Sequence, residues 1–187
     1  MGTRYRYFFA GGNTSKGFVH FYDSILDGLD RVFILKGGPG TGKSTMIRRI
    51  AEQSAKRVDE IWLLPCASDP DSLDGVIIPA WKAAVVDGTA PHVIEPKLPG
   101  AVEEYVNLGE AWNSQNLIKQ KDRIASLQAQ VKDAYDQAFD GFRKALRVHD
   151  DWEEVYIRSM DHKEADKLTE ELIHQFFAKI QLDKKPN

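Results

Sequence analysis

The feature that most constrains the fold of this chain is a glycine-rich segment, residues 37–45, which reads GGPGTGKST. It follows the apolar run Val32–Leu35 after one residue and directly precedes a helical pattern. A strand, a glycine-rich turn and a helix in this order form the phosphate-binding loop known as Walker A. The sequence therefore predicts an α/β protein of the P-loop NTPase class, a three-layer sandwich with a mostly parallel sheet.

Each part of this segment has a chemical role in the predicted site. Glycines let successive backbone N–H groups point toward phosphates, and the start of the helix adds partial positive charge. Lys43 is expected to reach the β- and γ-phosphates as a catalytic group, and the Ser44 hydroxyl to ligate Mg²⁺. The alternative is that this segment is only a tight connection between a strand and a helix. However, every position that the Walker A motif requires is filled. The predicted ligands are ATP and Mg²⁺, bound by Gly38, Pro39, Gly40, Thr41, Gly42, Lys43, Ser44 and Thr45.

A second metal ligand is predicted at Asp87. The run Ala83–Val86 is small and apolar, as in a strand buried on both faces, and it delivers Asp87 to the ligand-binding edge of a parallel sheet. This favours a Walker B role in metal binding and catalysis over the alternative of a simple Asp-Gly turn. Residues 88–92 read GTAPH, so no glutamate follows Asp87 as a catalytic base.

Composition excludes several classes of protein. The 187 residues are 42% hydrophobic and 28% charged, which is ordinary for a globular domain. A net charge of −3 gives no general attraction to nucleic acid or anionic membranes. Cys66 is the only cysteine, so no intrachain disulfide forms, and no apolar run reaches membrane-spanning length. We expect a cytoplasmic protein that does not bind membranes; the sequence gives no clear signal for nucleic acid, although local basic patches remain possible.

The chain divides by pattern into an α/β core, residues 1–100, and a helical extension, residues 101–187. Strands are predicted at residues 4–10, 31–36, 60–65 and 83–87, and helices at 18–29 and 43–57. In the extension a helix is expected at 101–112. A long helix from Leu117, a break near Ser159 and a further helix then predict a C-terminal helical hairpin. The hairpin either covers its own apolar stripe and the sheet or acts as a lid or docking arm.

Several linked motifs give the chain a wider resemblance. These are residues 7–18, the glycine-rich segment, residues 68–79 and residues 87–92. Together they resemble a little-characterised bacterial family of P-loop ATPase-like proteins. The resemblance implies nucleotide binding and a second, related P-loop half in proteins about twice this length. This chain looks like the first half, so a second P-loop half or a homo-oligomer is the expected partner.

Three classes of function remain open on the sequence. The first is a Mg²⁺-dependent ATPase or nucleotide switch. The second is a small-molecule kinase whose acceptor is held by the acidic loop 68–75, with Asp69, Asp71 and Asp74 as either ligands or turn residues. The third is a nucleotide-binding module without hydrolysis. His92 and Glu95 are candidates for positioning water, and the sheet is expected to gain a late strand near 179–182 or a strand from another chain.

Overall fold

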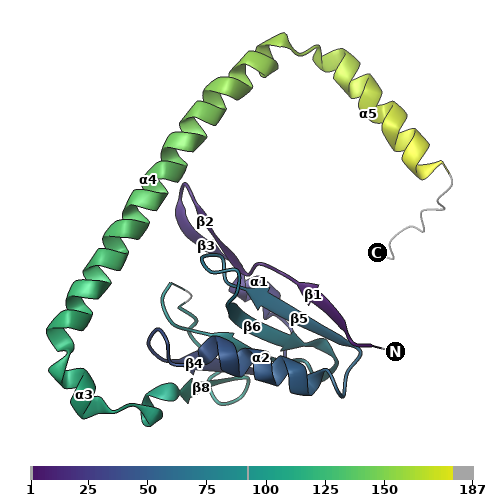
Figure 1. Ribbon diagram of the computed structural model, residues 1–187. Coiled ribbons are helices and arrows are strands. Elements are labelled where there is room, and N and C mark those ends of the chain that lie inside the picture. Colours follow the sequence, from purple (N-terminus) through teal and green to yellow (C-terminus); the bar gives the residue numbers. More distant parts are fainter. Residues whose placement is uncertain (1, 92, 179–187) are drawn as a thin grey trace. The chain divides into compact units, whose positions relative to one another are not determined.

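The computed structural model describes residues 2–91 and 93–178, and its core is one six-stranded sheet (Figure 1). The strand order is β1-β5-β6-β7-β4-β8. Every neighbouring pair is parallel except those made by β6, which runs antiparallel to both β5 and β7. The strands are β1 (Arg4–Tyr7), β4 (Arg31–Lys36), β5 (Glu60–Pro65), β6 (Leu73–Ile78), β7 (Ala83–Asp87) and β8 (Glu103–Asn107). The prediction of an α/β fold with a mostly parallel sheet is confirmed.

Alternating apolar residues give the sheet two buried faces. In β4, Val32 and Ile34 pack on one face and Leu35 on the other. The face of Leu35 is covered by helix α2 (Lys43–Ser54), whose Ile47 and Ala51 are buried against it. β6 is buried along its whole length because it lies between β5 and β7 in the middle of the sheet.

On the second face, Ala10, Tyr22 and Ile25 pack against the sheet from a segment that is mostly not helical, so the prediction of a helix over 18–29 is wrong. The chain forms β2 (Gly11–Thr14), β3 (Gly17–His20) and the short α1 (Tyr22–Ile25) instead. The reason is a tight turn: Gly17 has a φ of 92°, and the Thr14 hydroxyl donates to the Gly17 carbonyl over 2.8 Å. These local bonds favour a hairpin over the helical spacing of Phe18 and the apolar residues that follow it.

The segment predicted as a helix over 101–112 instead begins with strand β8. Its backbone pairs in parallel with β4, from Val32 opposite Glu103 to Lys36 opposite Asn107. Without β8, the edge of β4 would be unpaired, and this long-range pairing outweighs a weak helical pattern. The sheet therefore extends to Asn107, followed by the 3₁₀ turn η2 (Leu108–Ala111). The late strand expected near 179–182 lies outside the described residues.

The C-terminal part is helical as predicted, with α3 (Ser114–Lys119), α4 (Lys121–Ser159) and α5 (His162–Phe177). The break falls at Ser159, and the Asp161 carboxylate accepts from the backbone N–H groups of Lys163 and Glu164 to begin α5. The chain forms two compact units, one up to Arg143 and one from Lys144. Among residues 2–91 and 93–178, no helix has both the length and the apolar character to cross a membrane.

Candidate functional site

The glycine-rich segment connects the end of β4 to the start of α2, as its motif predicts. Gly40 and Gly42 have φ angles of 74° and 86°, a region that residues with a side chain rarely adopt. Within the loop, the Thr41 hydroxyl donates to the Gly38 carbonyl over 2.7 Å. Gly42 is the N-cap of α2 and has no side chain there, so the first N–H groups of the helix are left to other acceptors.

Lys43 lies at the centre of the site. Its Nζ donates to the carbonyls of Gly37 and Gly38, each over 2.9 Å, and lies 3.6 Å from Oδ2 of Asp87. The Lys43 and Asp87 side chains are only 10% and 15% exposed. The pairing of β4 with β7 explains this proximity, because it sets Leu35 opposite Asp87 at the carboxyl edge of both strands. The structure thus brings these two predicted catalytic residues together.

Asp87 also begins a turn. Its setting is therefore compatible with both interpretations of its sequence, a metal-site residue and the start of an Asp-Gly turn. Its Oδ1 accepts from the Thr89 backbone N–H over 2.8 Å and from the Thr89 hydroxyl. Gly88 between them is in close contact with the core: a Cβ on it would lie 2.2 Å from Cγ2 of the buried Ile34. One oxygen of Asp87 is therefore held by the turn, while the other faces Lys43.

Ser44, the other predicted metal ligand, links α2 to the sheet. Its Oγ accepts from the Leu73 N–H over 2.9 Å, at the start of β6. A hydroxyl oxygen has two lone pairs, so this bond leaves one lone pair and the proton for another partner. Pro39 and Thr45 lie on the same segment, in the loop and in the first turn of α2 respectively.

The acidic loop divides into turn residues and one buried acid. The Asp69 carboxylate accepts from the Asp71 N–H and the Ser72 hydroxyl, and the Asp71 carbonyl accepts from Arg48. These bonds give Asp69 a role in the turn. Asp74 differs, because it belongs to β6 and is 7% exposed.

Asp74 and Asp87 lie at the same edge of the sheet. Gly75 of β6 pairs with Val86 of β7 at the end of the antiparallel ladder; Asp74 directly precedes Gly75 and Asp87 directly follows Val86. Burial raises the pKa of the Tyr22 hydroxyl far above its usual range, and the charges of Asp74 and Asp87 raise it further. Burial also raises the pKa of the Cys66 thiol, with Asp74 acting in the same direction. Burial is the main cause of both shifts, and nearby carboxylates add to it.

Lys36 helps to hold the chain segment that follows Asp87, a role that the sequence analysis did not predict. Its Nζ donates to the carbonyls of Gly88 and Ile94, over 2.8 and 3.3 Å, and lies 4.9 Å from the ring centre of Tyr105. It therefore anchors the chain that follows Asp87. Its place at the end of the strand before the glycine-rich segment is the signal that could have identified it.

Glu95, one of the two residues proposed to position water, contacts Tyr105 and Lys36 instead. Glu95 accepts from the Tyr105 hydroxyl over 2.7 Å and lies 3.9 Å from the Lys36 ammonium, with its side chain 74% exposed. These contacts hold Glu95 beside Tyr105 of β8. His92 lies outside the described residues.

The arrangement is suited to binding anions and cations together. The glycine-rich segment supplies backbone N–H groups and an ammonium, and Ser44, Asp74 and Asp87 supply oxygen atoms of the kind that Mg²⁺ prefers. Comparisons with models of protein families, with curated proteins and with solved structures gave no match.

Proposed function

We propose that the glycine-rich segment binds the phosphates of ATP with Mg²⁺, and that the protein is a Mg²⁺-dependent ATPase or nucleotide switch. The observation that carries the proposal is the setting of Lys43, an ammonium held between two loop carbonyls and Asp87. Phosphate oxygens are stronger partners for an ammonium than neutral carbonyls, because these hydrogen bonds are assisted by charge. Lys43 can exchange its two carbonyl partners for phosphate while remaining close to Asp87.

The acidic residues support the cation half of this proposal. Asp87 and Asp74 are both largely buried, and Lys43 is the cation paired with Asp87. Buried carboxylates require a compensating positive charge, and Mg²⁺ with oxygen ligands supplies one. Ser44 and Asp87 are the proposed metal residues, with Asp74 beside them. When bound, the ion would neutralise phosphate charge.

The surroundings of Asp87 favour slow hydrolysis. Thr89 lies two residues after Asp87. Its backbone N–H and its hydroxyl both donate hydrogen bonds to the Asp87 carboxylate. Neither group is a general base. A nucleotide switch, or an ATPase completed by a second P-loop half or by another copy of the chain, is consistent with this arrangement. The kinase alternative has less support, because the Asp69 carboxylate is used within its own turn.

Titration with a fluorescent ATP analogue, with and without Mg²⁺, tests the proposal. Charge-assisted hydrogen bonds contribute about 1.5–3 kcal/mol each, so Lys43→Ala and Lys43→Met should weaken binding by at least about tenfold. Asp87→Asn should reduce the gain in affinity from Mg²⁺ more than it reduces metal-free binding. Lys132→Ala is the matched control, since it removes an exposed lysine–aspartate pair on α4.

Two results would reject the proposal. One is unchanged affinity in a Lys43 variant whose circular dichroism matches the wild type. The other is an Asp87→Asn variant with a full response to Mg²⁺, which would remove Asp87 from the metal site and direct attention to Asp74.

A further inference from the structure

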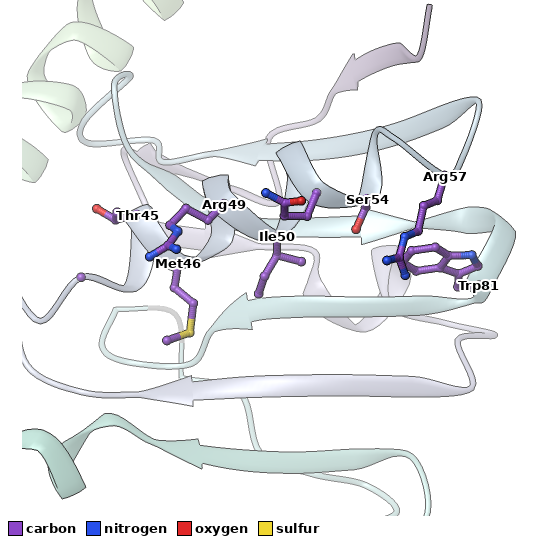
Figure 2. Close-up of a pocket in the computed structure, with 9 residues that line it drawn as sticks. Thr45, Met46, Arg49, Ile50, Ser54, Arg57 and Trp81 are labelled. Atoms are coloured by element: carbon purple, nitrogen blue, oxygen red, sulfur yellow. The ribbon is translucent and has the colours of Figure 1, made fainter.

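An open groove of about 760 Å³ runs along one flank of α2, where Met46 and Ile50 point away from the helix (Figure 2). Apolar side chains of Met46, Ile50 and Trp81 line it, and the guanidinium groups of Arg49 and Arg57 add positive charge. None of the lining residues is acidic. They are Gly42, Thr45, Met46, Arg49, Ile50, Gln53, Ser54, Arg57 and Trp81.

The groove follows from how α2 covers the sheet. The helix packs mainly against β6, with smaller contacts to β5 and β7. On the same face, Phe33 of β4 and Val106 of β8 are only partly buried. Met46 is 36% exposed and Trp81 is 44% exposed. An apolar strip with a basic rim is therefore open to a further element, and its shape along a helix suits another helix.

Helix α5 has the complementary chemistry. Leu168, Leu172 and Phe176 recur every four residues, so they share one face of the helix, and each is more than 60% exposed. Glu164 and Glu171 lie along one side of this stripe by helical spacing. The charge that flanks the stripe is thus opposite to the charge of the groove.

Lengths and charge spacings also agree. The 16 residues of α5 span about 24 Å, and the 12 residues of α2 span about 18 Å, with Gly42 and Arg57 extending the groove beyond the two ends of the helix. Glu164 and Glu171 are about 10 Å apart along their axis; Arg49 lies about 8 Å before the end of α2, and Arg57 lies in the turn just beyond that end. Glu164 is already paired with Lys167, but an exposed pair of this kind is weak and exchangeable.

We infer that the groove binds α5 of a second copy of the chain. Each copy then offers one groove and one α5, so two equivalent contacts form a closed, two-fold symmetric dimer. The apolar stripe fills the groove, and the two glutamates face the two arginines. The groove adjoins the proposed nucleotide site at Gly42 and Thr45, but the charged residues of the contact, Arg49 and Arg57, are not among those proposed to bind nucleotide.

Paired charge reversals test the inference. One variant carries Arg49→Glu and Arg57→Glu, and the other carries Glu164→Arg and Glu171→Arg. Within each variant, groove and helix have the same charge, so each should dissociate at least tenfold more readily than the wild type in analytical ultracentrifugation. A mixture of the two should restore the dimer, because both contacts between unlike copies join opposite charges. Lys119→Glu with Lys121→Glu, on α3 and α4, is the control for net charge and should leave the dimer intact.

Several outcomes would overturn the inference: a monomeric wild type at about 100 μM, reversals without effect, or a mixture that stays dissociated. Binding of the fluorescent ATP analogue, measured on the same variants, should match the wild type. Conversely, Lys43→Ala should dimerise normally, so failure of the nucleotide proposal and failure of the dimer are distinguishable.

Discussion

Gly75, at the centre of the sheet, provides a test of the packing that positions the candidate site. It pairs with Leu64 of β5 on one side and Val86 of β7 on the other. A Cβ on Gly75 would lie 2.7 Å from Cδ1 of Leu64 and 3.0 Å from Cγ1 of Val86. Both neighbours are completely buried, so neither can move into solvent. Gly75→Ala should therefore force a shift in the middle of the sheet.

The expected loss can be estimated from one extra methyl group in a filled core, which costs about 1–3 kcal/mol. With a denaturant dependence of about 2 kcal/mol per molar urea, a loss of about 2 kcal/mol lowers the unfolding midpoint by about 1 M. Tryptophan fluorescence is a suitable probe, because Trp62 lies in β5 near Leu64. Gly12→Ala is the matched control: Gly12 is also a strand glycine, without positive φ, and its added Cβ would meet nothing within 4 Å.

A double mutant separates steric overlap with Leu64 from any destabilisation that alanine causes at position 75 for other reasons. Leu64→Ala removes the nearest clashing atom, so Gly75→Ala should cost less in that background than in the wild type. A coupling free energy of about 1 kcal/mol or more is expected. The reasoning is refuted if Gly75→Ala is as mild as Gly12→Ala, or if its effect adds to that of Leu64→Ala without coupling.

Two further predictions concern chemistry at the site. Because burial raises the pKa of the Cys66 thiol, its alkylation by iodoacetamide should reach half its maximal rate at a higher pH than free cysteine does; an equal or lower pH would contradict the burial. Phosphate release from ATP should be slow, roughly 10⁻⁴ to 10⁻² per second for the isolated chain, because no base follows Asp87. Rapid turnover that does not depend on protein concentration would exclude the need for a partner.

The parts of the fold that were predicted correctly are those encoded locally. The strand, glycine-rich loop and helix from Arg31 to Ser54 follow one another without a gap, so motif and periodicity suffice. The strand Ala83–Asp87 is marked by its unbroken apolar run. Asp87 could then be assigned a place beside Lys43, because parallel strands end at the same edge of a sheet.

The parts that were missed depend on pairing between distant segments. β8 is a strand because it pairs with the edge of β4. The sequence of Glu103–Asn107 contains no pattern that predicts this pairing. β6 contains Asp74 and Gly75, which are typical of turns, and its burial comes from strands on both sides. The helix expected over 18–29 does not form, because the chain turns at Gly17 instead. The hydrogen bond that the Gly17 carbonyl accepts depends on backbone conformation, which the spacing of apolar residues does not reveal.

The reversed direction of β6 is what supplies the candidate site with a second buried acid. In a parallel strand, a residue near the beginning would lie at the edge opposite the glycine-rich segment. β6 is antiparallel to β7, so Asp74 near its beginning reaches the same edge as Asp87 at the end of β7. Asp74 and Asp87 are both largely buried, and carboxylates of this kind can ligate Mg²⁺. Asp74→Asn should therefore be tested beside Asp87→Asn: if both acids serve the metal, each change should reduce the gain in ATP affinity from Mg²⁺.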